Sequence, residues 1–263
     1  MFPRRTNLTP TDDLSFIDVP GLFPPDVDEI HVSVTWTYDL PRAEWLAAQW
    51  SHVAPVTIGG PATGQRGEAF VPGMYIGNGG VITSRGCFNK CWFCSVWKRD
   101  GTLRELPITS GWNVLDDNIL ATSRPHFLAV MDMLKKQQHR ARFTRGLEAK
   151  ILRPWHVEQL KALNPEYVFF AYDTPDDWEP LVAAARLCAD HEWLNRHTHR
   201  CYCLIGYPDD TLEHAEFRLR RVLSLGIFPM AMLWRNERGD TDPAWRRFQR
   251  EWARPAIIAG KVA

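Results

Sequence analysis

From Val81 onward, short apolar runs alternate with longer helical patterns, and this alternation is the feature that most constrains the fold. Repeated strand–helix units are typical of a parallel sheet, because each helix carries the chain back to the start of the next strand. The sequence therefore predicts an α/β domain with six parallel strands. The expected strands are Val81–Arg85, Asn113–Asp116, Arg142–Thr144, Tyr167–Tyr172, Arg200–Ile205 and Pro229–Trp234.

Helical patterns fill the intervals between these strands and follow the last one. Pro125 and Pro154 stand where helices are expected to begin, because proline suits the first turn of a helix. Asp210 and Thr211 are two candidate N-caps for the helix after the fifth strand. Two helices are expected to begin near Arg124 and Pro154. Three more are expected over Asp176–Asp190, Leu212–Leu225 and Pro243–Trp252.

The number of strand–helix units limits the architecture. A complete eight-unit β/α barrel usually needs about 250 residues, and the chain from Val81 to its end at Ala263 is shorter than that. Six units fit and eight do not, so we expect a partial (β/α)6 barrel over residues 75–263. Its open side could admit a large substrate.

The first 74 residues follow a different pattern. An arm rich in proline and aspartate precedes a strand over Glu29–Trp36, a helix over Leu40–Trp50 and a strand over Val56–Pro61. We expect residues 1–74 to form this arm and a small, truncated Rossmann-like β-α-β extension ahead of the barrel.

Charge and composition exclude several classes of protein. Lys plus Arg and Asp plus Glu both number 31, so the net charge is zero and no overall field attracts nucleic acid or an anionic membrane. No apolar run suits a signal peptide or a membrane span, which predicts a cytoplasmic protein with no membrane partner. The six cysteines would stay reduced there, so clustered cysteines indicate metal ligands or redox groups.

The strongest local motif is a cysteine cluster directly after the first barrel strand. Cys87, Cys91 and Cys94 have the spacing Cys-x3-Cys-x2-Cys on one tight loop. Three thiolates can bind three irons of a [4Fe-4S] cluster and leave the fourth iron open to another ligand. Structural zinc is the weaker interpretation, because it takes four protein ligands and no further Cys or His lies near this loop.

These residues resemble the signature of the radical S-adenosylmethionine (SAM) superfamily, which has the same cysteine spacing. Phe93 matches the aromatic residue before the last cysteine, and Arg85-Gly86 match the pair before the first. The resemblance covers roughly residues 75–235. It implies that SAM binds the open iron through its amine and carboxylate and that a donor such as flavodoxin or ferredoxin reduces the cluster. A 5′-deoxyadenosyl radical would then remove a hydrogen atom from the substrate.

The end of the second strand is expected to face SAM, because functional residues of β/α barrels lie at the carboxyl ends of strands. Many superfamily members carry Gly-Gly-Glu there, whereas this chain has Asp116, Asp117 and Asn118. The acidic variant resembles members related to cobalamin-binding radical SAM proteins. A carboxylate could accept a hydrogen bond from the SAM amine. The alternative is an N-cap for the next turn.

Three further polar residues follow the third and fourth strands. Glu148 could bind a ribose hydroxyl of SAM, and Arg145 could pair with its carboxylate. Asp173 ends the fourth strand, where polar residues of the family often face SAM or substrate. The alternatives are solvated loop charges at Arg145 and Glu148 and a simple turn at Asp173.

The fifth strand carries Cys201 and Cys203 and leads into the segment 205–208, which is similar to an Ile-Gly-x-Pro segment of the superfamily near SAM. The two cysteines share one face of the strand. If that face points inward, Cys203 could act catalytically by donating a hydrogen atom or reacting with substrate. The alternative is that both are small core residues, as buried free cysteines usually are.

A basic stretch spans residues 135–153 and holds one acidic residue, Glu148. It could contact the phosphates of a nucleotide or polynucleotide. A run of charges is more often a solvated helix face, so nucleic acid is a possible but less favoured partner. The basic residues are Lys135, Lys136, Arg140, Arg142, Arg145, Lys150 and Arg153.

The N-terminal β-α-β piece resembles a remnant of the cobalamin-binding domain that precedes the barrel in one subgroup. The Asp-x-His-x-x-Gly loop of that domain is missing here, so no cobalamin is expected. The sequence thus predicts an enzyme with one [4Fe-4S] cluster and SAM that acts on a small molecule, a nucleotide or a modified base.

The motifs leave the reaction class open among isomerase, lyase, transferase and oxidoreductase, because fold and cofactor do not set the reaction. Two alternatives differ in function. One is a non-catalytic iron–sulfur protein used for binding or redox sensing, and the other is a radical SAM enzyme that modifies nucleic acid.

Overall fold

The computed structural model describes residues 1–67 and 69–260. Its main body is a six-stranded sheet with the order β10-β9-β8-β7-β6-β3, in which every neighbouring pair is parallel. The predicted α/β class and the six parallel strands are confirmed. The strands are β3 (Gly80–Val81), β6 (Asn113–Val114), β7 (Arg142–Phe143), β8 (Tyr167–Tyr172), β9 (His199–Ile205) and β10 (Phe228–Leu233).

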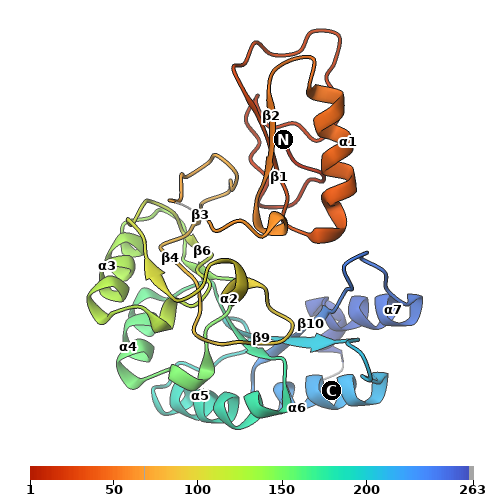
Figure 1. The fold of residues 1–263 in the computed structure, drawn as a ribbon. Coiled ribbons are helices and arrows are strands. Elements are labelled where there is room, and N and C mark those ends of the chain that lie inside the picture. The colour runs from red at the N-terminus through yellow and green to blue at the C-terminus, as the bar shows by residue number, and fades with distance from the viewer. Residues whose placement is uncertain (68, 261–263) are drawn as a thin grey trace.

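Helices connect these strands and follow one another along the outside of the sheet (Figure 1). The predicted helices are confirmed, and two short ones, α2 and α8, were not predicted. No helix among the described residues combines the length and the apolar character that crossing a membrane requires. The helices are α2 (Val96–Arg99), α3 (Arg124–Lys135), α4 (Pro154–Leu163), α5 (Trp178–Asp190), α6 (Leu212–Ser224), α7 (Pro243–Trp252) and α8 (Pro255–Ala259).

Side chains that accept backbone hydrogen bonds mark where α3, α6 and α7 begin. The Ser123 hydroxyl accepts from the backbone N–H of the third residue of α3. Thr211 does the same for α6, so it is the N-cap of the two candidates there. Asp210 instead binds the guanidinium of Arg218 (Nη2–Oδ2 2.8 Å) and accepts from the backbone N–H of Gly206 (2.9 Å). This pair fixes the turn at the end of β9.

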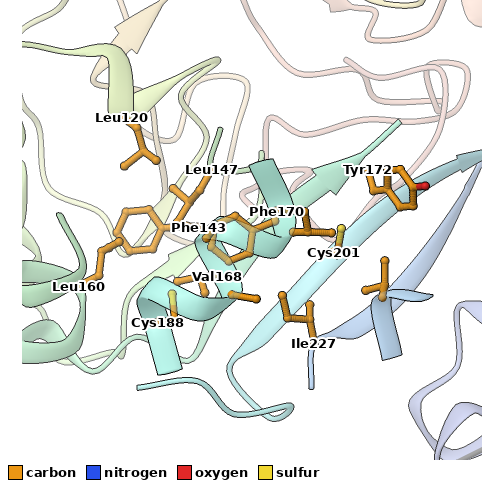
Figure 2. Close-up of a cluster of buried hydrophobic side chains, with 14 of the residues drawn as sticks. Leu120, Phe143, Leu147, Leu160, Val168, Phe170, Tyr172, Cys188, Cys201 and Ile227 are labelled. Atoms are coloured by element: carbon orange, nitrogen blue, oxygen red, sulfur yellow. The ribbon is translucent and has the colours of Figure 1, made fainter. Parts of the chain in front are cut away.

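The main core lies between the sheet and its helices (Figure 2). Alternate residues of β8, Val168, Phe170 and Tyr172, are buried in it, as the two-residue period of a strand requires. Cys201 of β9 and Cys188 of α5 lie in the same cluster. Burial of each large apolar side chain here contributes roughly 1.5–3 kcal/mol to folding.

The strand predicted over Val81–Arg85 is in fact two strands. β3 ends at Val81 and pairs with β6, whereas β4 (Ser84–Arg85) pairs antiparallel with β5 (Arg104–Glu105). Between them, the backbone N–H of Thr83 donates to the buried Asp116 carboxylate (2.6 Å) instead of to a neighbouring strand. The chain therefore leaves the main sheet at this residue. A short antiparallel ribbon therefore closes the base of the cysteine loop.

The N-terminal unit is the predicted β-α-β piece, with β1 (Ile30–Ser33), α1 (Leu40–Trp50) and β2 (Val56–Gly59). β1 and β2 form a separate parallel pair, and the unit has its own small core. It stands beside the loop that follows β10 (Figure 1), where the Tyr38 ring lies under the Arg235 guanidinium at 5.5 Å. The division between residues 1–74 and 75–263 stays a prediction.

Candidate functional site

The cysteine motif lies on the connection from β4 to β5. Cys87, Cys91 and Cys94 are free and partly buried. Gly86 makes the entry turn with φ +90°, and a Cβ there would lie 2.4 Å from the Thr102 carbonyl oxygen. Only glycine fits this combination of left-handed backbone and close approach. The glycine between Arg85 and Cys87 is therefore required by steric fit.

The three thiols act on one another electrostatically. Burial raises the pKa of Cys91, and the thiols of Cys94 and Cys87 raise it further. Burial likewise raises the pKa of Cys94. Converting Cys91 and Cys94 to thiolates together would therefore be unfavourable unless a cationic group, such as bound iron, were to neutralise them.

The thiols do not surround a single ion. Among residues 1–67 and 69–260, no three His, Cys, Asp or Glu side chains come close enough together to hold one metal ion. A four-iron cluster makes a different demand, because each thiolate binds its own iron. The donor set of three cysteines on one loop fits that demand and leaves one iron without a protein ligand.

A buried ionic cluster supports the base of the loop, and sequence reasoning missed it. The Asp100 side chain is fully buried and pairs with Arg99 (2.7 Å) and Arg104 (3.5 Å). Gly67 also donates its backbone N–H to this carboxylate (3.0 Å). Arg85 lies beside it, where burial lowers the pKa of its guanidinium. Gly67 and Arg85 are distant from Asp100 in the sequence, and Arg99 and Arg104 look like ordinary loop charges. No local sequence signal therefore marks the cluster.

Asp116 is buried and its carboxylate is fully engaged with the start of the cysteine loop. It accepts from the Thr83 backbone (2.6 Å), the Thr83 hydroxyl (2.6 Å) and the Ser84 hydroxyl (2.7 Å). Burial raises the pKa of this carboxyl group, and the hydrogen bonds oppose that shift. These contacts make Asp116 a structural support for the loop, and its predicted contact with SAM stays a prediction.

Asp117, the residue after Asp116, also binds the cysteine loop. Its Oδ2 accepts from the Gly86 backbone N–H (2.9 Å), and its Oδ1 lies 3.9 Å from Nη1 of Arg145. Arg145 comes from the end of β7 and has 43% of its side chain exposed. The end of the second strand is thus tied to both the cysteine loop and the third strand, and Arg145 keeps donors for a ligand.

Asn118 connects the second strand directly to a cysteine. It is buried, and its Nδ2 donates to Sγ of Cys87 (3.7 Å) and to the carboxylate of Glu148. Its Oδ1 is buried and has no hydrogen-bond partner among the described residues. The predicted residues Asn118 and Glu148 therefore meet at the cysteine loop. The side-chain oxygen of Asn118 is the acceptor that has no partner there.

Asp173 and the aromatic residues of the loop also lie near the motif. Burial and the nearby Asp177 raise the pKa of Asp173 to about 7, and both acids raise the pKa of the Cys91 thiol. The Trp92 ring contacts Phe93 (centroids 5.4 Å apart) and Tyr207 after β9 (5.8 Å). The loop therefore contacts the residues that follow the fifth strand.

Cys203 lies in the main core. It is fully buried, as is Cys201, and both belong to the core between the sheet and its helices. Hydrogen-bond partners of the two sulfurs are backbone carbonyls of their own strand. This position favours the alternative that the cysteines are small core residues and gives no support to a catalytic role for Cys203.

Internal contacts occupy most of the basic stretch 135–153. Arg142 pairs with Glu166 (2.7 Å), and Arg140 donates to the backbone of Asn164 (3.0 Å). Lys135 and Lys150 also have acidic partners, namely Asp132 and Asp177, whereas Arg145 keeps exposed donors beside Asp117. Because these side chains already serve the fold, the stretch offers little free charge to a polynucleotide.

A hollow of about 290 Å³ lies at the carboxyl ends of β9 and β10. Trp234 and Trp245 line it together with Gly206 and the side chain of Asp240. Its size suits part of a small molecule. No protein-family model matches this chain, and a search of curated proteins finds no match either.

Proposed function

We propose that this protein is a radical SAM enzyme whose [4Fe-4S] cluster is held by Cys87, Cys91 and Cys94. The observation that carries the proposal is the cysteine loop, with three free thiols on the connection from β4 to β5, which follows β3 of the six-stranded parallel sheet. We further propose that this sheet forms the partial (β/α)6 barrel of that superfamily. Functional groups of such barrels lie at the carboxyl ends of the strands.

The residues around the loop fit SAM as the ligand of the open iron. The unpaired Oδ1 of Asn118 can accept from an N–H of the SAM amine, and Glu148 places a negative charge beside it. Arg145 has exposed donors for the SAM carboxylate. When bound, the reduced cluster supplies an electron that cleaves SAM, and the resulting 5′-deoxyadenosyl radical removes a hydrogen atom from the substrate.

The substrate that we propose is a small molecule, a nucleotide or a modified base. The hollow beside Trp234 and Trp245 supports this class, because flat aromatic walls favour planar groups. The occupied charges of residues 135–153 argue against a polynucleotide. An electron donor such as flavodoxin or ferredoxin completes the proposal, which includes no cobalamin.

Anaerobic reconstitution with iron and sulfide tests the proposal. After reduction and addition of SAM, we expect the wild-type protein to bind about four irons per chain and to form 5′-deoxyadenosine. Cys91→Ala should lose both properties. Cys188→Ala removes a cysteine from the core instead and should keep both.

Two outcomes would contradict the proposal. Failure of the wild-type protein to bind a cluster would remove its basis. A stable cluster that never cleaves SAM would favour the binding or redox-sensing alternative.

A further inference from the structure

Asn118 is a buried amide with an unequal set of partners. It is 3% exposed and follows β6 directly before a 3-10 turn over Ile119–Ala121. Its nitrogen donates to Cys87 and to Glu148, whereas its oxygen has no partner among the described residues. A buried amide oxygen without a hydrogen bond costs free energy, so this acceptor points to a ligand with a donor group.

The orientation of the amide follows from its neighbours. An ionised carboxylate accepts hydrogen bonds and cannot donate them, so the nitrogen of Asn118 must face Glu148. Turning the amide over would place its oxygen against the carboxylate and the Cys87 sulfur. The oxygen is therefore held away from Glu148 and the Cys87 sulfur, and the hydrogen bond from the Gly86 backbone N–H to Asp117 fixes the neighbouring backbone.

Cys87 differs from the other two cysteines in the donors that reach it. Its sulfur accepts from the Asn118 side chain (3.7 Å) and from the Asn89 backbone N–H (3.4 Å). Within the described part of the chain, no side-chain donor contacts the sulfur of Cys91 or Cys94. A hydrogen bond to a cluster sulfur stabilises the more negative, reduced state and so raises the reduction potential.

We propose that Asn118 is a positioning residue that couples ligand binding to the reduction potential of the cluster. A donor group bound at Oδ1 polarises the amide and strengthens the N–H···S bond on its other side, because linked hydrogen bonds reinforce one another. Binding of SAM therefore makes the cluster easier to reduce through Asn118. This inference rests on the proposed function and adds a residue that connects its two cofactors.

The test is a redox titration of the anaerobically reconstituted full-length protein, followed by electron paramagnetic resonance with and without SAM. Asn118→Leu keeps the side-chain volume and removes both polar atoms. Without SAM, we expect this variant to show an about tenfold smaller equilibrium constant for reduction, which for one electron is a potential 59 mV more negative. SAM should shift its potential by less than it shifts the wild-type potential.

SAM on the open iron can change the potential by itself, so the difference between the two shifts is the result that matters. Asn89→Ala is the matched control, because it removes a loop amide but keeps the backbone donor to Cys87. It should retain both wild-type potentials. Wild-type potentials in Asn118→Leu, with and without SAM, would overturn the coupling.

A second measurement covers a variant that fails to load iron. Wild-type protein labelled with ¹⁵N only at asparagine side chains should show a hyperfine coupling to the reduced cluster that changes when SAM is added. Absence of that coupling would reject the proposal, even if SAM cleavage proceeds. If the wild-type protein binds no four-iron cluster, the proposed function itself fails, which is a different result.

Discussion

The two halves of the main sheet are held in place by different forces. β8, β9 and β10 are long strands with continuous apolar faces in the core, whereas β3, β6 and β7 are two residues long each. In the short half, side-chain hydrogen bonds replace part of the strand pairing, as at Asp116 and between Thr144 and Asn113 (2.7 Å). The long half contributes more strand residues to the buried core, and the short half positions the cysteine loop.

The largest expected effect is on global stability, from the long half. Phe170→Ala removes a fully buried ring from β8 and should lower the free energy of unfolding by about 4 kcal/mol. Iron binding at low temperature should persist in the fraction that remains folded. Urea titration measures the loss, and Phe217→Ala on the exposed face of α6 is the control. Equal losses in the two variants would remove the distinction between the halves.

The next effect should fall on the cysteine loop. Asp116→Ala leaves three buried donors without their acceptor and should cost about 3 kcal/mol. It should also reduce iron loading more than Phe170→Ala does, because the loop loses its structural support. Asp132→Ala, which breaks an exposed pair with Lys135, should cost less than about 1 kcal/mol. Normal iron loading in Asp116→Ala would show that this support is dispensable.

Mild acid should weaken both halves alike. Burial lowers the pKa of His156 in α4 and of His199 in β9 to about 4, against about 6.5 in an unfolded chain. Between these values the unfolded chain binds more protons, so stability falls as the pH decreases from 6.5 toward 4.

The expected loss is about 2 kcal/mol for each histidine between pH 6.5 and 4.5. His199→Gln should flatten the pH dependence of the unfolding free energy, and the exposed His197→Gln is the control. A slope unchanged by His199→Gln would contradict this source of acid sensitivity.

The smallest effect separates the core from the site. Cys203→Ala should cost about 1 kcal/mol and leave 5′-deoxyadenosine formation and substrate turnover unchanged, because Cys203 is buried in the core. Cys201→Ala offers a parallel case on the same strand. Loss of turnover in a folded, iron-loaded Cys203→Ala protein would return the catalytic role to this thiol.

The sequence predicted the long half of the sheet well because its signals are local. Apolar runs and the candidate cap Thr211 gave the bounds of β9 and α6 to within one residue, and β8 matches its predicted range Tyr167–Tyr172 in full. The short half depends on contacts between distant residues. The hydrogen bonds between Thr83 and Asp116 divide the predicted first strand in two. No pattern within residues 81–85 predicts these hydrogen bonds.

The site shows the same division between local and distant information. Spacing alone identified the three cysteines as a group, and the carboxyl-end rule selected Asn118 and Glu148, which do meet there. The rule could not say that Asp116 binds the cysteine loop. The alternation of Cys201 and Cys203 placed both on one face of the strand but did not say which face is buried. Tyr202, on the opposite face, is also a residue that is often buried.

The central claim is that three cysteines hold four irons and leave one open. Mössbauer spectra of protein reconstituted with ⁵⁷Fe test it directly, before and after the addition of SAM. We predict a [4Fe-4S] cluster in which SAM changes the spectrum of one iron and leaves the other three alike. A spectrum of mononuclear iron, or a four-iron cluster that does not respond to SAM, would contradict the account.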